Sequence, residues 1–319
     1  MVQTVESRRE KASSSRYSPV WGRVALALCL GLAAAGPALA LSGGAGAQTL
    51  PGDSPWSGVG SLSVNGQLFT ATLIAPGYVL TAAHVVNGAD AGSVVFRTAA
   101  GESFSSVASA IYIDPAYTGS TAGNLAGDPT VHGDLAIIRL ADAAPADLGA
   151  YSLYTGDLYH QTISMVSYGG SSTQATTGAN RVDLLFADAA GQDQTYVFDR
   201  DGSALSSNMI GADVPANGTL GEGVEAGIVN GDSGSAAFVY VNGEWQLAGI
   251  NTFSLLFAGG STTQGDVGTG GGGIVLASQM DWIQSVISAP VPEPEPAWML
   301  LAGLAVLGGR LRRHRQPRA

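Results

Sequence analysis

The sequence is poor in cysteine, in charged residues and in aromatic residues. Its 319 residues include one cysteine, Cys29, while charged residues make up 12% and aromatic residues 7%. Cys29 lies in an N-terminal apolar run that we expect to be removed. The mature chain would then have no disulfide, no thiolate metal site and no cysteine nucleophile. Hydrophobic residues make up 45% of the chain, which excludes a disordered protein.

Basic residues are almost absent from the middle of the chain. Of the 14 lysines and arginines, five lie in the first 23 positions and five in the last ten. Between residues 41 and 296, four arginines stand against 23 acidic residues, which gives a formal charge of −19. A body this acidic repels polyanions, so we expect no nucleic acid among the partners.

The N-terminal apolar run is too short to cross a membrane. Residues 24–35 are 12 apolar or small residues that follow five basic ones and precede a helix-breaking Gly36-Pro37. This order is typical of a secretory signal peptide over residues 1–40, with cleavage after Ala40. The alternative is an uncleaved anchor, but a membrane span needs roughly 18–20 residues.

The C-terminus has a second apolar run between a stiff spacer and a basic end. Residues 290–296 are rich in proline and glutamate, and residues 297–319 are an apolar stretch followed by arginines. The arrangement resembles the PEP-CTERM sorting signal of exopolysaccharide-producing Gram-negative bacteria. The resemblance implies processing by an exosortase, transient membrane association through the tail, and a location in the cell envelope or extracellular matrix. The alternative is an ordinary tail anchor.

The body between these ends reads as β structure with one helix. Residues 41–52 are predicted to be a flexible lead-in. Short runs punctuated by Gly, Asn and Asp predict antiparallel strands in a barrel or sandwich. The predicted strands are residues 60–64, 93–96, 136–140, 162–166, 236–241 and 246–250, with turns at residues 65–66 and 242–243. Residues 279–288 have the apolar periodicity of a helix, and the glycine run 268–273 is predicted to be the loop before it.

Three short segments contain a histidine, an aspartate and a serine in that order. They hold His84 after Val-Leu-Thr-Ala-Ala, Asp134 in Gly-Asp-Leu-Ala-Ile-Ile, and Ser233 in Asn-Gly-Asp-Ser-Gly-Ser. A serine hydroxyl becomes a good nucleophile when an imidazole takes its proton and a carboxylate orients that imidazole. The three segments supply one residue for each of these roles.

The order of the three residues excludes other serine hydrolases. An α/β-hydrolase needs its histidine after the serine, and the only histidine after Ser233 is His314 in the tail. A Gly-x-Ser-x-Gly elbow is also missing, because position 235 is serine. A subtilisin-type enzyme needs its acid before the histidine, and the sequence around Ser233 does not fit that family.

Residues 67–84, 231–234 and 247–253 resemble the corresponding segments of trypsin-like (chymotrypsin-fold) serine proteases, within a similarity that extends over about residues 58–288. The resemblance implies an all-β fold of two antiparallel six-stranded barrels, residues 53–150 and 151–289, the second ending in the helix. It implies no cofactor and a polypeptide substrate, and we expect a monomer.

The same resemblance assigns roles to individual residues. Ser233 would be the nucleophile, His84 the general base and Asp134 the orienting carboxylate. The backbone N–H groups of Gly231 and Ser233 would form the oxyanion hole, and glycine at 231 lets the backbone turn its N–H inward. Thr252 occupies the position of a serine that supports the aspartate in the family.

The sequence departs from the family around the substrate pocket and at the N-terminus. Gly227 replaces the aspartate of tryptic enzymes, so cleavage after lysine or arginine is not expected. Phe253 and Ser254 would form the rest of the pocket with Thr252. No activation site is recognisable, so Asp232 needs a partner: one of the four internal arginines, or a group made available by another maturation route.

Other polar residues receive structural interpretations. His132 and His160 are predicted to lie in surface loops. Residues 199–202, Asp-Arg-Asp-Gly, superficially resemble a calcium loop, but further carboxylates and a terminal glutamate are missing, so we interpret them as a turn and expect no metal. The sequence predicts an exported serine endopeptidase; the alternative is a catalytically silent surface binding protein on the same fold.

Overall fold

The computed structural model describes residues 27–28, 40–100, 103–119, 133–188, 190–202, 208–210, 219–221 and 223–289. Most of the predicted signal peptide, His132, the proline-rich spacer and the C-terminal tail lie outside the described residues. Within the described part, no helix is long and apolar enough to cross a membrane.

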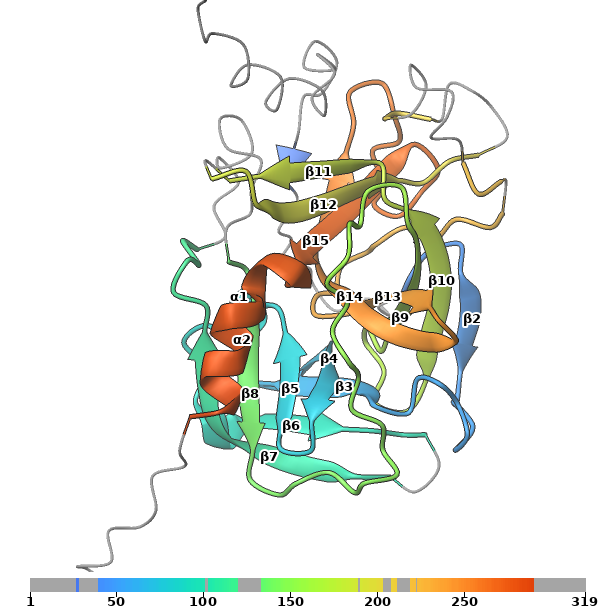
Figure 1. Ribbon diagram of the computed structural model, residues 1–319. Coiled ribbons are helices and arrows are strands. Elements are labelled where there is room, and N and C mark those ends of the chain that lie inside the picture. The colour runs from blue at the N-terminus through green and yellow to red at the C-terminus, as the bar shows by residue number, and fades with distance from the viewer. Residues whose placement is uncertain are drawn as a thin grey trace, which may run out of the picture.

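The first half of the body forms a closed barrel of six antiparallel strands (Figure 1), in the order β3-β4-β5-β8-β7-β6. Apolar side chains such as Leu62, Val79 and Ile138 are fully buried inside it. The short helix α1 and a 3₁₀ turn, η2, connect β5 to β6. The elements are β3 (Val59–Val64), β4 (Gln67–Ala75), β5 (Tyr78–Thr81), α1 (Ala83–Val86), η2 (Ala91–Ser93), β6 (Val94–Arg97), β7 (Ser105–Ile113) and β8 (Ala136–Leu140).

The second half forms a nine-stranded sheet that is not closed. Its main path runs β11-β12-β15-β14-β13-β9-β10-β2, and β1 pairs with β14 off this path. The fold is chymotrypsin-like and mostly β, as predicted, with one closed barrel and a second, open sheet. The strands are β1 (Ala27–Leu28), β2 (Ala45–Gln48), β9 (Thr162–Ser167), β10 (Ala175–Arg181), β11 (Leu184–Ala187), β12 (Asp193–Asp199), β13 (Ala236–Val241), β14 (Glu244–Leu256) and β15 (Thr269–Val275).

The open edge between β10 and β11 has a physical cause. Strand β10 pairs on its outer side with β2, and Ala179 forms a bridge with Glu225. The side chain of Asn180 donates to the carbonyls of Asp199 and Ala226 at 2.8 and 3.0 Å. On this side the backbone of β10 is thus paired with β2 and Glu225, and its Asn180 side chain bonds to the segments beyond, so β10 does not pair with β11.

The lead-in predicted to be flexible is part of the folded structure. Leu41 and Leu50 are 3% and 4% exposed, and β2 lies between them. Ser42 exchanges two backbone hydrogen bonds with Gly227, at 2.8 and 3.0 Å. The prediction was wrong because the pairing partners lie more than 120 residues away in the sequence, beyond the reach of a local pattern.

The glycine run predicted to be a loop is the buried strand β15, between β12 and β14. A Cβ added at Gly272 would lie 2.6 Å from the ring of Phe253, and one at Gly270 would lie 2.8 Å from the ring of Phe257. Glycine is therefore required because aromatic side chains from β14 and its following turn, together with backbone carbonyls of β12, occupy the space over this strand.

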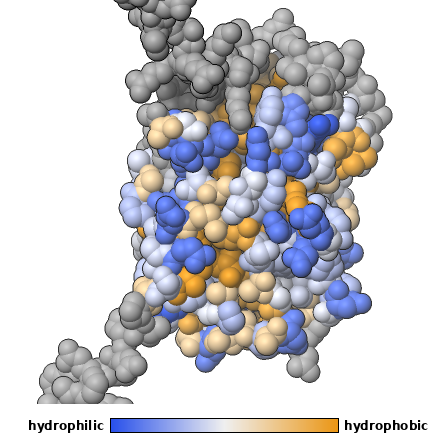
Figure 2. All heavy atoms as spheres, in the orientation of Figure 1, coloured by the Kyte–Doolittle hydropathy of each residue, from blue (hydrophilic) through white to orange (hydrophobic). Residues whose placement is uncertain are grey.

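The C-terminal helix covers the region where the barrel and the sheet meet. A 3₁₀ turn, η6 (Leu276–Gln279), leads into α2 (Met280–Ile287), close to the predicted range. Ile283 is fully buried in a cluster that includes Leu80 of the barrel and Phe238 of the sheet. On the face seen in Figure 2, hydrophilic and hydrophobic residues are interspersed.

Candidate active site

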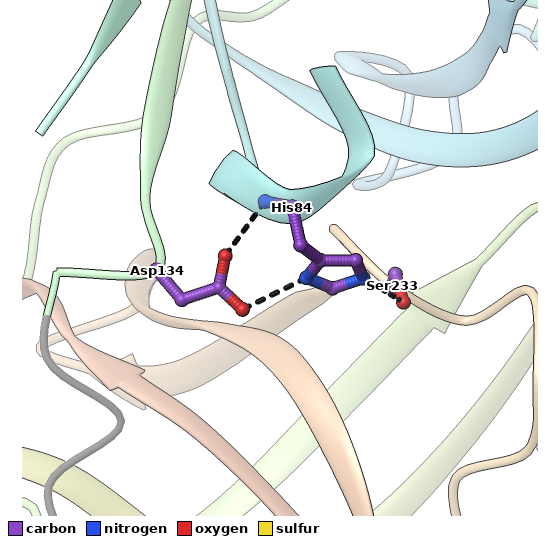
Figure 3. A network of polar contacts seen from close by, with 3 residues as sticks. All are labelled: His84, Asp134 and Ser233. Carbon is purple, nitrogen blue, oxygen red and sulfur yellow. Dashed lines mark hydrogen bonds and ion pairs between the residues drawn. The ribbon is translucent and has the colours of Figure 1, made fainter. Parts of the chain in front are cut away.

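His84, Asp134 and Ser233 lie in line at the junction of the barrel and the sheet (Figure 3). His84 Nε2 is 2.8 Å from Ser233 Oγ, and His84 Nδ1 is 2.8 Å from Asp134 Oδ2. The side chain of His84 is 13% exposed and that of Asp134 only 3%. With Nδ1–H donating to the buried carboxylate, Nε2 is left to accept the serine proton.

The barrel supplies the histidine and the aspartate. His84 is the second residue of α1, directly after β5, and its backbone N–H donates to Asp134 Oδ1 at 2.9 Å. Asp134 therefore receives one hydrogen bond from the ring and one from the backbone of the same residue. Gly133 before it has a φ of 60°, and an added Cβ there would lie 2.6 Å from the backbone of Ala116 and Tyr117.

The loop that carries Ser233 is held from both halves of the fold. The N–H of Thr70 on β4 donates to the carbonyl of Ser233 at 3.2 Å, and the N–H of Gly234 donates to the carbonyl of Asn251 at 2.9 Å. Gly234 has a φ of 82°, and a Cβ there would lie 2.1 Å from the Thr70 carbonyl. Only glycine allows this approach.

Two backbone N–H groups of the same loop, one on each side of Asp232, have no acceptor among the described residues. Asp232 N–H donates to the Val229 carbonyl, while those of Gly231 and Ser233 donate to no acceptor among the described residues. Gly231 has a φ of 99°, a conformation that favours glycine. The geometry leaves both N–H groups available to an oxyanion, the role assigned to them by the resemblance.

Asp232 is fully buried, and its hydrogen-bond donors among the described residues are two backbone nitrogens and a serine hydroxyl, with no arginine. The N–H of Leu41 lies 3.2 and 3.1 Å from the two carboxylate oxygens. Ser167 Oγ donates to Oδ1 at 2.6 Å, and the N–H of Val229 donates to Oδ2 at 2.9 Å. Burial raises the pKa of Asp232 to about 7, although these hydrogen bonds act in the opposite direction.

Leu41, Ser167 and Thr70 were missed by sequence reasoning. For Leu41 a signal existed, since it directly follows the predicted cleavage site after Ala40. Ser167 and Thr70 lie in ordinary strand patterns and carry no local signal for their roles.

Thr252 does not support Asp134 as expected. Its hydroxyl is buried and has no hydrogen-bond partner among the residues that the structure describes. The register between β14 and β15 shifts from the Asn251–Gly273 pair to the Phe253–Gly272 pair, so Thr252 is the extra residue of a β-bulge.

The other expected pocket residues lie on two adjacent segments. Gly227 belongs to the loop before the nucleophile, and Phe253 and Ser254 belong to β14. Gly227 packs against Gly265, where an added Cβ would lie 3.0 Å from the Gly265 Cα. Phe253 is 6% exposed and its ring lies against Gly272 in a small apolar cluster with Leu255.

His160 lies in a turn before β9, where its ring packs 3.7 Å from that of Tyr159. Its backbone has a φ of 60°, and its Nε2 is buried without a partner. Burial and the charge of Arg181 lower the pKa of His160. It is thus a half-buried residue and makes no described contact with the catalytic residues.

The predicted turn at residues 199–202 belongs to a buried acid cluster: Asp183, Asp199, Asp201 and Glu225. Each of the four residues is at most 4% exposed. Burial, followed by the charge of Asp199, raises the pKa of Asp183, and the same causes raise the pKa of Asp201 to about 7. The sequence interpretation of an isolated turn was incomplete, because the fold brings two distant carboxylates to it.

Comparisons with known proteins agree with this geometry. A family model described as Trypsin matches residues 44–283. A search of curated proteins finds no match. Among solved structures, the inactivated protease paralogue S-D1 of the scabies mite is similar, with a TM-score of 0.51 and 15% identity. The match covers 78% of this chain and 98% of that one.

Proposed function

Since the chain belongs to the trypsin family, we propose that it is an exported serine endopeptidase that cleaves peptide bonds through an acyl-enzyme on Ser233. The observation that carries the proposal is the unbroken hydrogen-bonded line from Asp134 through His84 to Ser233, with 2.8 Å at each link to the ring.

The proposed reaction uses each group at a stated atom. His84 Nε2 takes the proton of Ser233 Oγ as that oxygen attacks the substrate carbonyl carbon. The negative charge that develops on the carbonyl oxygen is stabilised by the N–H groups of Gly231 and Ser233. His84 then gives its proton to the leaving amine, and water repeats the sequence to release the acyl group.

A silent binding protein is the competing function. The similar mite protein is an inactivated protease paralogue, so this fold also occurs without activity. In the present chain all three triad side chains are in place, and Asp134 holds His84 by two hydrogen bonds. A binding protein would not require that alignment, which favours the enzyme.

Export and maturation are part of the proposal. Cleavage after Ala40 would convert the Leu41 amide, which lies within 3.2 Å of both Asp232 oxygens, into an ammonium. An ammonium can donate to both oxygens and neutralise the buried charge. The N-terminus made by signal peptidase would therefore stabilise the loop between Gly231 and Ser233, with no further propeptide.

Labelling with a fluorophosphonate probe tests the nucleophile. Ser233→Ala should abolish labelling and reduce casein hydrolysis by about 10⁶-fold, because the attacking oxygen is gone. Ser152→Ala removes the hydroxyl of an exposed serine and should leave both unchanged. Probe incorporation that persists in folded Ser233→Ala, or a parent chain that neither labels nor digests casein, would overturn the proposal.

The sorting tail is tested separately. We propose that an exosortase-type enzyme processes residues 290–319 and that the tail holds the chain at the membrane only transiently. Deleting this segment should release the protein into the medium with unchanged casein hydrolysis. Cell association that is unaffected by the deletion would contradict a sorting role.

A further inference from the structure

We propose that Thr70 and Ser167 are positioning residues whose hydroxyl groups form a buried relay to Asp232. The relay would hold the backbone N–H groups on either side of Asp232, those of Gly231 and Ser233, in the geometry that stabilises the oxyanion. The inference rests on the proposed function, because it concerns how those two N–H groups come to face the reaction. Thr70 lies on β4 of the barrel and Ser167 at the end of β9 in the open sheet, and both are fully buried.

The hydrogen bonds of the relay run in one direction. Ser167 Oγ donates to Asp232 Oδ1 at 2.6 Å, a distance typical of a hydroxyl bound to a carboxylate. A hydroxyl has one proton and two lone pairs, so the same oxygen must accept from its other two partners, the Gly169 N–H at 3.1 Å and the Thr70 hydroxyl at 3.3 Å. Thr70 Oγ1 in turn accepts from the Tyr168 N–H at 2.8 Å. Both hydroxyl protons therefore point from the barrel toward Asp232.

Thr70 also binds the nucleophile loop directly. Strand β4 pairs with β5 only from Thr72 onward, so the backbone of Thr70 has no strand partner on the side away from β3. Its N–H donates instead to the Ser233 carbonyl at 3.2 Å. One barrel residue is thus connected to the loop at two points, to Ser233 through its backbone and to Asp232 through Ser167.

The segment that follows β9 packs against the same loop. A Cβ added at Gly169 would lie 2.8 Å from Asp232 Oδ1 and 3.1 Å from the carbonyl carbon of Gly231. Glycine at 169 therefore allows the backbone after Ser167 to lie directly on the loop. Because Asp232 is the residue between the two free N–H groups, a shift of its side chain would turn the rigid peptide planes on both sides of it.

Ser167 makes the shortest hydrogen bond to Asp232. The other donors are the Leu41 N–H, which is shared between the two oxygens at 3.2 and 3.1 Å, and the Val229 N–H, at 2.9 Å from Oδ2. Without the Ser167 hydroxyl, the Oδ1 atom would keep only the long bond from Leu41 among the described residues. A buried oxygen that loses its main donor is destabilised, so the carboxylate should rotate and the loop with it. A displacement of about 1 Å in a catalytic group can reduce a rate roughly 100-fold.

The rate of reaction with a fluorophosphonate probe, together with kcat and KM for a chromogenic ester, tests the role of Ser167. Ser167→Ala should lower the labelling rate and kcat by about 10–100-fold and leave KM unchanged, because the two N–H groups act on the developing oxyanion. Ser164→Ala removes the hydroxyl of a half-buried serine on the same strand and should change none of the three. A residue that only stabilised the fold would lower the unfolding free energy in urea and leave kcat unchanged.

Substitutions at Thr70 test the relay itself. Thr70→Val keeps the shape and the backbone N–H but removes the hydroxyl. It should lower kcat by about 3–10-fold, less than Ser167→Ala, because its link is the longer one. Thr70→Ser keeps the hydroxyl, and its kcat should stay close to that of the parent. Because the Thr70 hydroxyl acts on Asp232 through Ser167, the double variant Thr70→Val, Ser167→Ala should be no slower than Ser167→Ala alone.

The outcomes separate this inference from the proposed function. Unchanged labelling and kcat in Ser167→Ala, a rise in KM alone, equal losses in Thr70→Val and Thr70→Ser, or losses that multiply in the double variant would each overturn the relay. If Ser167→Ala does not fold, the comparison of Thr70→Val with Thr70→Ser decides. A parent chain that does not react with the probe would refute the proposed function and the relay together, whereas a parent that reacts no faster than Ser167→Ala would refute only the relay.

Discussion

Buried carboxylates occur in two regions of this molecule, and the regions stabilise them by different means. Beside the nucleophile, Asp134 and Asp232 each face nitrogen donors from the chain itself: the ring and backbone of His84 for one, the backbone of Leu41 and Val229 for the other. In the acid cluster, the carboxyl groups of Asp183, Asp199 and Asp201 face one another.

The difference has a functional meaning. A carboxylate matched to a fixed N–H donor can hold that donor in place, which is what orientation of His84 and of the nucleophile loop requires. Carboxylates that face one another depend on what the solution supplies, either protons or a cation. The first region thus matches its carboxylates to the donors that they orient, whereas the second also places carboxyl groups against one another.

Among substitutions that test this difference between the two regions, we expect the largest effect on kcat at Asp134. Asp134→Asn keeps the size of the side chain but can no longer hold His84 in the tautomer that accepts the serine proton. We expect kcat for hydrolysis of a chromogenic ester to fall by about 10⁴-fold. The control is Asp201→Asn in the acid cluster, whose kcat should stay close to that of the parent. A loss of similar size in both variants would show that the distinction between the regions is wrong.

The second prediction concerns Asp232 and pH. In the unprocessed chain the folded state keeps the Asp232 proton up to about pH 7, while the pKa of an exposed aspartate is 3.8. Between these values the folded state binds more protons than the unfolded state, so stability falls as pH rises, by up to about 4 kcal/mol for this group. A chain that begins at Leu41 should escape that loss, because its ammonium favours the charged carboxylate.

Urea unfolding of both forms across pH 4–8, in the Ser233→Ala background, measures the difference. The two forms should have nearly equal unfolding free energies at pH 4, and the processed form should be increasingly the more stable one toward pH 7. The acid cluster is common to both forms and cancels in the comparison. Parallel curves over the whole range would contradict the pairing of Leu41 with Asp232.

Local sequence predicted well those features that depend on neighbours in the chain. Strands β8 and β13 begin and end where alternation placed them, and the turns at Asn65 and Asn242 have the positive φ typical of hairpins. The residues of the proposed triad could be named in advance because each lies in a distinctive segment. Their spacing in sequence says nothing of distance, and the fold brings His84 and Ser233 together across 149 positions.

Features that depend on distant partners could not be predicted. Strand β15 reads as a loop because its glycines are explained only by groups distant in sequence, among them the rings of Phe253 and Phe257 and the backbone carbonyls of the neighbouring strands. The acid cluster reads as a turn because Glu225 lies 24 positions after Asp201. Likewise, no local pattern connects Leu41 to Asp232 across 191 positions.

The smallest predicted effect lies on the path between the two regions. Strand β12 ends in the acid cluster, and its Tyr196 donates to Asn251 Oδ1 at 2.6 Å, while Asn251 Nδ2 donates to Ser235 Oγ at 2.9 Å. Burial keeps the pKa of Tyr196 well above 10, so the hydroxyl remains a donor. Tyr196→Phe keeps the ring and leaves the Asn251 oxygen unpaired, which should lower the unfolding free energy by about 1–2 kcal/mol in urea titrations.

The effect of Tyr196→Phe on kcat should be slight, because the backbone bond from Gly234 to Asn251 is unaffected and continues to hold the nucleophile loop. Tyr240→Phe, at a position that is 58% exposed, is the matched control and should change neither quantity. A hundredfold fall in kcat with only the expected loss of stability would show that the Tyr196 hydroxyl positions Ser233. In that case β12 would couple the acid cluster directly to the nucleophile.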